Sequence, residues 1–346
     1  MRRCFFMIWS VCLLWSVSLW GQENEDSVAW FQTRSYGKYV VADHYAPILS
    51  INTGMVSNAP DYNIDVERSG AYIPLNETVL GGDIPFYQRF WDNQALSLSF
   101  PLSIALSFDF SEAETAPILN TDYRFALLEL NYWHKLAHPY FKNWGIKFIP
   151  FFHESTHIGD ELTLARIAAD ASIIRVNVTY EAMNLAFTLN DPLGQDQRNS
   201  MYRIGAKFLL NPNKGWYSFS AREGDTILVS PSQRWIEPYV QYQYQNPASF
   251  LSFGNTMFVL SADLSLRVKF SYPYLSYDGQ NYTDVITSEY YVPSLTLMAG
   301  WQFYNSDHVL SDFGLFLRAY RGLNYHGQFR NLDNYEFYGF SIVYGL

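Results

Sequence analysis

The feature that most constrains this chain is a strict two-residue alternation of large apolar with small or polar side chains. Between Ser97 and Phe110, every second residue is large and apolar: Leu98, Phe100, Leu102, Ile104, Leu106, Phe108 and Phe110. A helix would scatter these side chains around its circumference, whereas a β-strand places all of them on one face. We therefore predict a strand with one apolar face and one polar face.

The same alternation recurs along the rest of the chain. It is found at 124–134, 172–183, 202–208, 240–245, 260–270, 295–303 and 338–346. The segments are about 10 to 14 residues long, which suits tilted strands that cross a bilayer. No apolar run after the N-terminal leader approaches the roughly 20 residues of a membrane helix. The pattern predicts an all-β fold, a transmembrane antiparallel outer-membrane β-barrel, because only helices and closed sheets satisfy the backbone in lipid.

The number of strands is predicted from the segments and their connections. Ten strands are recognisable from Ser97 onward, with weaker candidates at Tyr36–Ala42 and Ile84–Phe90. Because such barrels have even strand numbers, we expect about twelve strands. Ten remain possible if the N-terminal residues form a plug or a periplasmic extension. Long connections at 111–121, 157–171, 211–234, 271–290 and 322–334 alternate with short ones, as expected for long extracellular loops and short periplasmic turns.

The N-terminus has the order of a secretory signal peptide. Arg2 and Arg3 precede an apolar run that reaches Trp20, and both cysteines of the chain lie within it. We expect a signal peptide at 1–21, an N-terminal segment at 22–96 that holds weak first strands or a plug, and the barrel at 97–346. The expected location is the bacterial outer membrane.

Charge limits the partners of the chain. The formal net charge is -10 at pH 7, which disfavours nucleic-acid binding. We expect contact with outer-membrane lipids, and with the barrel assembly machinery through the C-terminal strand. The residues predict neither a cofactor nor a bound metal, and they leave the oligomeric state open.

One segment, 151–161, is dense in chemically useful groups. Its residues His153, Glu154 and His157 match the H-E-x-x-H pattern of zinc metallopeptidases. That pattern needs a helix to bring both histidines onto the metal. Here the flanking residues predict a strand, on which the histidines would stand about 13 Å apart with Glu154 on the opposite face. This remains a remote alternative.

A second interpretation is a serine-dependent lipid esterase. The His153-x-Ser155 element resembles the H-x-S element of outer-membrane phospholipase A and of lipid A deacylase. Residues i and i+2 of a strand share a face, so His153 could activate Ser155, with Glu181, Asn177 or Glu161 as the orienting third group. Continuous alternation from Trp144 places the pair in the lumen, unless a bulge at Pro150 exchanges the faces.

The third interpretation, which the sequence favours, is a buried polar network that closes the barrel. Its members would be the charged residues of the expected lumen face, extended at the external rim by the groups of the motif. The lumen face holds Asp109, Glu129, Lys147, Arg175, Glu181, Arg203, Lys207, Asp263, Arg267, Lys269 and Arg318, and the rim adds His153, Ser155, His157, Asp160, Glu161 and Asn177. Charges of both signs can pair in a narrow interior. The predicted function is therefore a narrow or closed pore, or a structural envelope component, with this cluster at the external rim.

The motif also resembles a family of uncharacterised bacterial proteins, a domain of unknown function with the signature H-x-S-S-H-L-G-D-E. The matching residues are His153, Ser155, His157, Gly159, Asp160 and Glu161, with Thr156 and Ile158 as replacements. Similarity extends to 120–123, 180–182 and 202–205, and more loosely to 41–43 and 81–82, so that it spans roughly 39–210. The resemblance implies an envelope location and a shared site, but no activity.

Overall fold

The computed structural model describes residues 26–32, 39–57, 72–111, 116–159, 179–192, 198–210, 234–247, 255–269, 273–277, 282–286, 289–304, 313–330 and 334–344. Within these ranges the chain is nearly all β-strand, with one short 3-10 turn, η1, at Gly327–Phe329. No helix of this part of the chain is long and apolar enough to cross a membrane. The segment expected to be a signal peptide, 1–21, lies outside the described residues.

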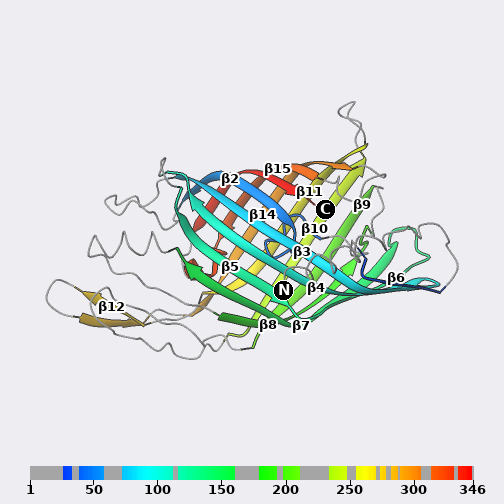
Figure 1. The fold of residues 1–346 in the computed structure, drawn as a ribbon, viewed down its shortest axis with the longest axis horizontal. Helices are drawn as coiled ribbons and strands as arrows, with labels where there is room; N and C mark the ends of the chain where they lie inside the picture. Colours follow the sequence, from blue (N-terminus) through cyan, green and yellow to red (C-terminus); the bar gives the residue numbers. More distant parts are fainter. Residues whose placement is uncertain are drawn as a thin grey trace, which may run out of the picture.

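The strands form one closed antiparallel barrel (Figure 1). Their bounds are β2 Leu49–Ser57, β3 Ile73–Trp91, β4 Gln94–Asp109, β5 Ile118–Ala126, β6 Glu129–Lys135, β7 Asn143–Ile158, β8 Thr179–Leu189, β9 Asn199–Leu209, β10 Ile236–Pro247, β11 Asn255–Lys269, β14 Tyr290–Tyr304, β15 Phe313–Gly322 and β16 Tyr335–Tyr344. Strands β5 and β6 both pair with β4 and β7, so they are two halves of one interrupted strand. Counted in this way, the described residues contain twelve barrel strands, as predicted.

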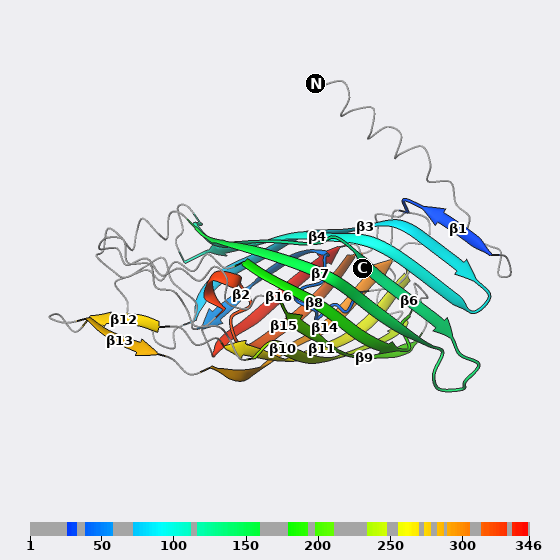
Figure 2. The ribbon, with the colours of Figure 1, turned by 90° about the horizontal axis from the view of Figure 1, so that it is seen from below.

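Neighbouring strands in the sequence are neighbours in the barrel, and one pairing, that of β2 with β16, closes the ring. Strand β2 pairs with β16, and β3 pairs with both β2 and β4. The short strand β1, Ser27–Trp30, pairs with the far end of β3 outside the ring. The hairpin of β12, Pro273–Tyr277, and β13, Tyr282–Ile286, lies beyond one end of the barrel (Figures 1 and 2).

Burial in this molecule is inverted relative to a water-soluble protein. On β4, Ser97 and Ser103 are buried, while Phe100 and Leu102 are exposed. The most exposed apolar side chains of the wall include Phe340, at 69%. An apolar outer surface and a polar interior are the arrangement expected of a barrel in lipid. The predicted transmembrane β-barrel is therefore the observed fold class.

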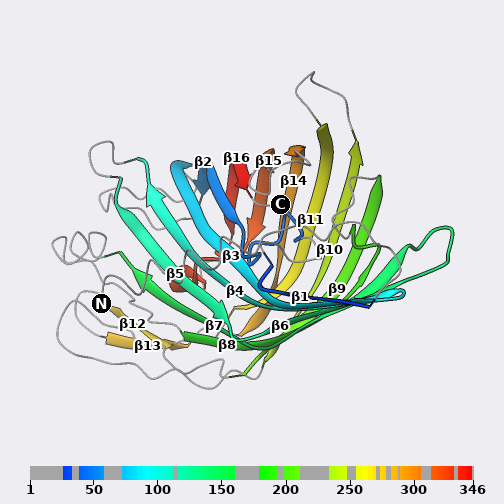
Figure 3. The ribbon, with the colours of Figure 1, turned by 45° about the vertical axis from the view of Figure 1, so that its right-hand side comes forward.

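The N-terminal segment 22–96 contributes both to the wall and to the interior. It holds strands β2 and β3, so the barrel begins at Leu49 rather than at the expected residue 97. The predicted strand near Ile84–Phe90 is part of β3. The candidate at Tyr36–Ala42 is wrong, because its described residues belong to a segment inserted into the lumen, Tyr39–Ile48, which we call the plug (Figure 3).

Apolar contacts and hydrogen bonds together hold the plug. Its buried residues pack against inward-facing side chains of five strands: Met201, Met257, Val259, Met298, Phe316 and Val343. The backbone N–H of Val41 donates to Gln243 Oε1 over 2.9 Å, and that of Ala42 donates to Ser261 Oγ over 3.2 Å. These contacts satisfy buried backbone donors, which are costly to leave unpaired.

Gly81 on β3 allows the plug backbone to approach the wall. A Cβ atom there would lie 2.6 Å from the carbonyl carbon of Pro47 and 2.7 Å from the nitrogen of Ile48. We therefore expect Gly81→Ala to lower the free energy of unfolding by about 1–3 kcal/mol, because backbone cannot move aside cheaply. Urea unfolding in detergent measures this change. Gly82→Ala is the matched control, since a Cβ there meets nothing within 4 Å; equal destabilisation by both variants would contradict the prediction.

Candidate functional site

The segment that carries the histidines and serine is the end of β7, and a bulge decides which way it faces. Ile149 pairs with Asn184 of β8, and Phe152 pairs with Ala182, so β7 advances three residues while β8 advances two. Pro150 lies in this irregularity; it has no N–H for the ladder, and proline inside sheets is found at edges and bulges. Beyond the bulge the buried residues are Glu154 and Thr156, rather than the odd-numbered residues buried before it.

A matching irregularity occurs in the neighbouring strand. Phe125 of β5 pairs with Leu102, and Glu129 of β6 pairs with Ser99, so four residues oppose three across the β5–β6 interruption. The face of this strand also changes, because the even-numbered Arg124 and Ala126 are buried before the interruption and the odd-numbered Glu129 and Asn131 are buried after it. The extra residue of β7 and that of the β5–β6 interruption lie at the same level of the barrel, so β7 stays in register with β5 and β6.

His153 and Ser155 therefore face outward, and their predicted place in the lumen is wrong. The alternation is continuous only up to the bulge, which exchanges the two faces. Glu181 was also expected among the lumen residues; it lies on the outer side of β8, because its neighbour Ala182 is buried. The register places Glu181 directly across from His153.

Aromatic rings surround the outward histidines. The ring centroids of Phe125 and His153 are 4.9 Å apart, and those of Tyr123 and His157 are 5.8 Å apart. Tyr123 is also the β5 neighbour of Ser155. His153, Ser155 and Glu181 are half-buried, whereas His157 is exposed. A small polar site thus lies within an otherwise apolar outer face, near the strand ends furthest from the C-terminus of β16. We call His153, Ser155 and Glu181 the outer-face site.

The remaining members of the predicted cluster do not all join this site. Asp160, Glu161, Arg175 and Asn177 lie outside the described residues. Lys147 faces the lumen as expected, where its ammonium is 2.8 Å from Glu129.

The geometry of β7 does not fit the zinc peptidase interpretation. The H-E-x-x-H residues are on a strand, and Glu154 points to the opposite face from His153 and His157. In the part of the chain that the structure describes, no group of three His, Cys, Asp or Glu side chains is placed to hold a metal ion.

Glu154 belongs instead to a buried ion-pair network on the inner face of the wall. Arg124 Nε donates to Glu154 Oε1 over 2.9 Å, and Arg124 Nη2 donates to Asp122 Oδ2 over 3.2 Å. All three side chains are buried. Because breaking such a pair leaves an uncompensated buried charge, each member is tied to the others.

A second inserted segment reaches this network from the connection between β15 and β16. We call its residues, Leu323–Arg330, the inner loop; Figure 2 shows its turn η1 in red inside the barrel. His326 lies 3.4 Å from Asp122 and 3.3 Å from Glu77, and its ring is buried. At its end, Arg330 pairs with Glu237 of β10.

The plug and the inner loop meet in the middle of the lumen. The ring centroids of His44 and Tyr325 are 3.6 Å apart, and Arg318 Nη2 lies 3.2 Å from His44 Nδ1. Arg124 Nη1 donates to the carbonyl oxygen of His44 over 3.4 Å. One hydrogen-bonded network therefore joins the plug to strands β5 and β15.

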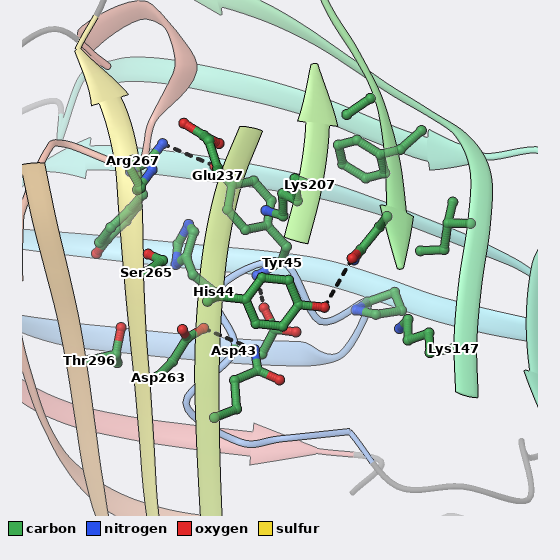
Figure 4. Close-up of a pocket in the computed structure, with 18 of the residues that line it drawn as sticks. Asp43, His44, Tyr45, Lys147, Lys207, Glu237, Asp263, Ser265, Arg267 and Thr296 are labelled. Atoms are coloured by element: carbon green, nitrogen blue, oxygen red, sulfur yellow. Dashed lines mark hydrogen bonds between the residues drawn. The ribbon is translucent and has the colours of Figure 1, made fainter. Parts of the chain in front are cut away.

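Beside this junction lies a cavity of about 80 Å³ (Figure 4). The plug supplies Asp43, His44 and Tyr45 to its lining, and the wall supplies Lys207 and Arg267 among others. Lys207 Nζ lies 3.0 Å from the centroid of the Tyr45 ring, and Arg267 Nη2 donates to the Tyr45 hydroxyl over 3.0 Å. Since one water needs about 10–15 Å³, the cavity has room for a few waters.

Sequence reasoning placed Arg203, Arg267 and Arg318 in the lumen, where they are buried, but it missed other residues that organise the interior. Glu77 and His326 were not singled out, because their partners are far away in the chain. Arg124 has a partner only two residues away, Asp122, and it was missed because the alternation was extended through the β5–β6 interruption. Weak signals existed at 41–43 and 120–123, both within the family resemblance. A strand pattern gives no sign that His44 and His326 would enter the barrel from its connections.

Comparison with known proteins gives a family match for part of the chain. A family model described as "Protein of unknown function (DUF1207)" matches residues 50–198. This match confirms the resemblance to a family of unknown function. None of the curated proteins matches the chain.

Several solved structures have a similar arrangement of strands. Outer membrane phospholipase A from Escherichia coli has 11% identity, coverage of 87% of this chain and 96% of that one, and a TM-score of 0.42. The TodX monoaromatic hydrocarbon channel has 9% identity, coverage of 86% of this chain and 87% of that one, and a TM-score of 0.41. The translocator domain of the autotransporter NalP from Neisseria meningitidis has 8% identity, coverage of 88% of this chain and 89% of that one, and a TM-score of 0.34.

The buried His326 predicts a dependence of stability on pH. Burial opposes charge on the imidazole, but hydrogen bonds to Asp122 and Glu77 and the charges of both carboxylates outweigh it and raise the pKa of His326. The contribution of protonated His326 to the free energy of unfolding is complete below the unfolded pKa of about 6.5. It is lost as pH rises through the raised pKa of the folded state. Urea unfolding of wild type and His326→Gln should therefore differ more at about pH 5.5 than at about pH 9.

His44 provides the opposite case. Its burial, together with the positive charges of Arg124 and Arg318, lowers the pKa of His44 well below its usual value. Its neutral form contributes stability above the unfolded pKa of about 6.5, and that contribution is lost as pH falls through the lowered folded pKa.

For His326, a difference in the free energy of unfolding between wild type and His326→Gln that does not change with pH would contradict the prediction, because it would mean that His326 is not charged beside Asp122 and Glu77.

Proposed function

We propose that this chain is an outer-membrane lipid hydrolase that cleaves acyl esters at the outer face of its barrel. The observation that carries the proposal is the bulge after Ile149, which puts His153 and Ser155 on the outward face with Glu181 across from His153. The apolar outer wall supports a membrane location, and the N-terminal pattern of a signal peptide supports export.

The three side chains have the chemical types of a serine hydrolase triad. His153 and Ser155 are two residues apart on one strand face, so their Cα atoms are about 6.6 Å apart. Side chains directly opposite on neighbouring strands have Cβ atoms about 4.5–5.5 Å apart. Glu181 is thus placed to orient the imidazole of His153 and to stabilise its protonated form, the role of the third group in a triad.

The reaction assigns one step to each residue. His153 removes the proton from the Ser155 hydroxyl as its oxygen attacks the ester carbonyl carbon. The protonated His153 then gives that proton to the leaving alcohol, and Ser155 holds the acyl group. Water, deprotonated by His153, attacks the acyl-serine and releases the fatty acid, which regenerates the serine hydroxyl. A lipid-facing position suits this substrate, because the acyl chains already lie against the outer wall.

We expect Ser155→Ala and His153→Ala each to lower kcat by at least about 1000-fold, because members of a triad act as a unit. Glu181→Gln should cause a smaller loss, since this group only orients and stabilises the imidazole. Fatty-acid release from mixed micelles measures the activity. Phospholipid micelles and lipid A micelles are tested separately, because both present acyl esters.

The matched control is Ser103→Ala, a buried serine of β4 on the lumen side. It should retain wild-type activity, and the activity should fractionate with the outer membrane. A fluorophosphonate probe should label wild type but not Ser155→Ala. Wild-type turnover by Ser155→Ala, or no ester hydrolysis by the folded wild-type protein, would refute the proposed function.

We also propose that the barrel is closed to solutes. The plug, the inner loop and the paired charges support this, since in the described residues they lie within the lumen and contact one another. Wild type in planar bilayers should show no stepwise conductance, whereas a variant that lacks residues 39–47 should show steps if it folds. Regular conductance steps from wild type would contradict closure without bearing on the hydrolase.

A further inference from the structure

The inner face of β7 lies directly behind His153 and Ser155, and its side chains contact both inserted segments. Phe152 faces the plug, where its ring centroid is 6.3 Å from that of Tyr45. Glu154 accepts the hydrogen bond of Arg124, and Thr156 Oγ1 donates to Asn120 Oδ1 over 3.1 Å. The backbone that carries the outward pair is therefore fixed from inside the lumen.

The inner loop packs against the same backbone. A Cβ atom at Gly327 would lie 2.7 Å from Thr156 Cγ2, 2.8 Å from its Cβ and 3.0 Å from its Oγ1. The backbone N–H of Gly327 also donates to Asp122 Oδ1 over 3.1 Å. Contact at Gly327 is so close that a single added methyl group must displace the loop or Thr156, whose Cβ atom is bonded directly to the β7 backbone.

The loop is also anchored to strands remote from β7. Arg267 Nη1 of β11 donates to the carbonyl oxygens of Leu323 and Asn324 over 3.2 and 3.1 Å. Arg330 pairs with Glu237 of β10. With one side fixed to β10 and β11 and the other side against Thr156, the loop spans the lumen and supports β7 from across the barrel.

We propose that the inner loop, Leu323–Arg330, is a positioning element for the outer-face site, and that Gly327 sets the distance at which it supports β7. This inference rests on the proposed hydrolase function. Thr156 follows Ser155 directly, so a displacement of Thr156 moves the nucleophile relative to His153 and Glu181. None of the loop residues contacts the substrate, and their effect reaches the site through the backbone of β7.

The direct test is Gly327→Ala in the full-length protein. The added methyl group pushes on Thr156, and a misplacement of about 1 Å can reduce a rate by about 100-fold. We expect kcat for ester hydrolysis to fall by about 10- to 100-fold with KM nearly unchanged, because lipid binding uses the outer wall. Gly82→Ala, on the open side of β3, is the matched control and should keep wild-type kcat.

A rescue variant separates positioning from general damage. Thr156→Ala removes Cγ2 and Oγ1, two of the three atoms that the new methyl group would meet. Added to Gly327→Ala, it should restore part of the lost kcat. If Gly327→Ala does not fold, Arg330→Gln tests the same idea, because it releases the loop from Glu237 and should lower kcat with the same KM.

The outcomes distinguish this inference from the function on which it rests. If Ser155→Ala is inactive but folded Gly327→Ala has wild-type kcat, the positioning role is refuted and the hydrolase stands. Wild-type kcat in Arg330→Gln refutes it equally where Gly327→Ala does not fold. If Ser155→Ala keeps its activity, the hydrolase itself fails. A kcat loss at Gly327 that Thr156→Ala partly reverses supports the positioning role.

Discussion

The structure depends on the closure of one antiparallel sheet whose residues alternate between lipid and lumen. In a closed sheet every strand has hydrogen-bonded neighbours on both sides, so the backbone N–H and C=O groups are paired, as a chain in lipid requires. Because alternate side chains must then be apolar on the outside, the intervening ones are polar and point inward. A narrow ring of twelve strands cannot leave these charges unpaired, since a buried charge is costly without a partner. The plug and the inner loop supply partners that the wall alone lacks.

One irregularity in this alternation gives the molecule its asymmetric site. Without the extra residue of β7, Glu154 would face lipid while His153 and Ser155 faced the lumen. The bulge brings Glu154 to Arg124 and puts His153 outside in the same step. The cost of a broken ladder is thus offset by a buried ion pair on one face, and the other face gains polar groups that the membrane otherwise disfavours.

The alternation made the fold predictable, and its failures are local. Strand periodicity, strand number and the long and short connections follow from a period of two, which needs no information from elsewhere in the chain. The phase of β7 was predicted wrongly because alternation was extended through Pro150. Two adjacent apolar pairs, Phe151-Phe152 and Leu127-Leu128, mark the level at which the faces change.

The interior could not be predicted in the same way. Glu77 and His326 are 249 residues apart in the chain, and neither lies in a motif that names the other. Barrel curvature and the paths of two inserted segments bring them together, and both are set by the whole ring. For the outer-face site, the residue types and their spacing were recognisable, but their orientation depended on the pairing of β7 with β8.

A filled interior and a polar site on the outer wall fit together mechanically. A thin sheet curved around water could shift its strands by small amounts, whereas β7 is held from within by Arg124 and by the inner loop. Polar and ionisable groups that face lipid are costly, and they are retained where they perform a function. His153, Ser155 and Glu181 carry that cost together at one place on the wall. For the proposed hydrolase, a filled interior is therefore better suited than an open one, because the lumen network holds the strand that carries the outer-face site.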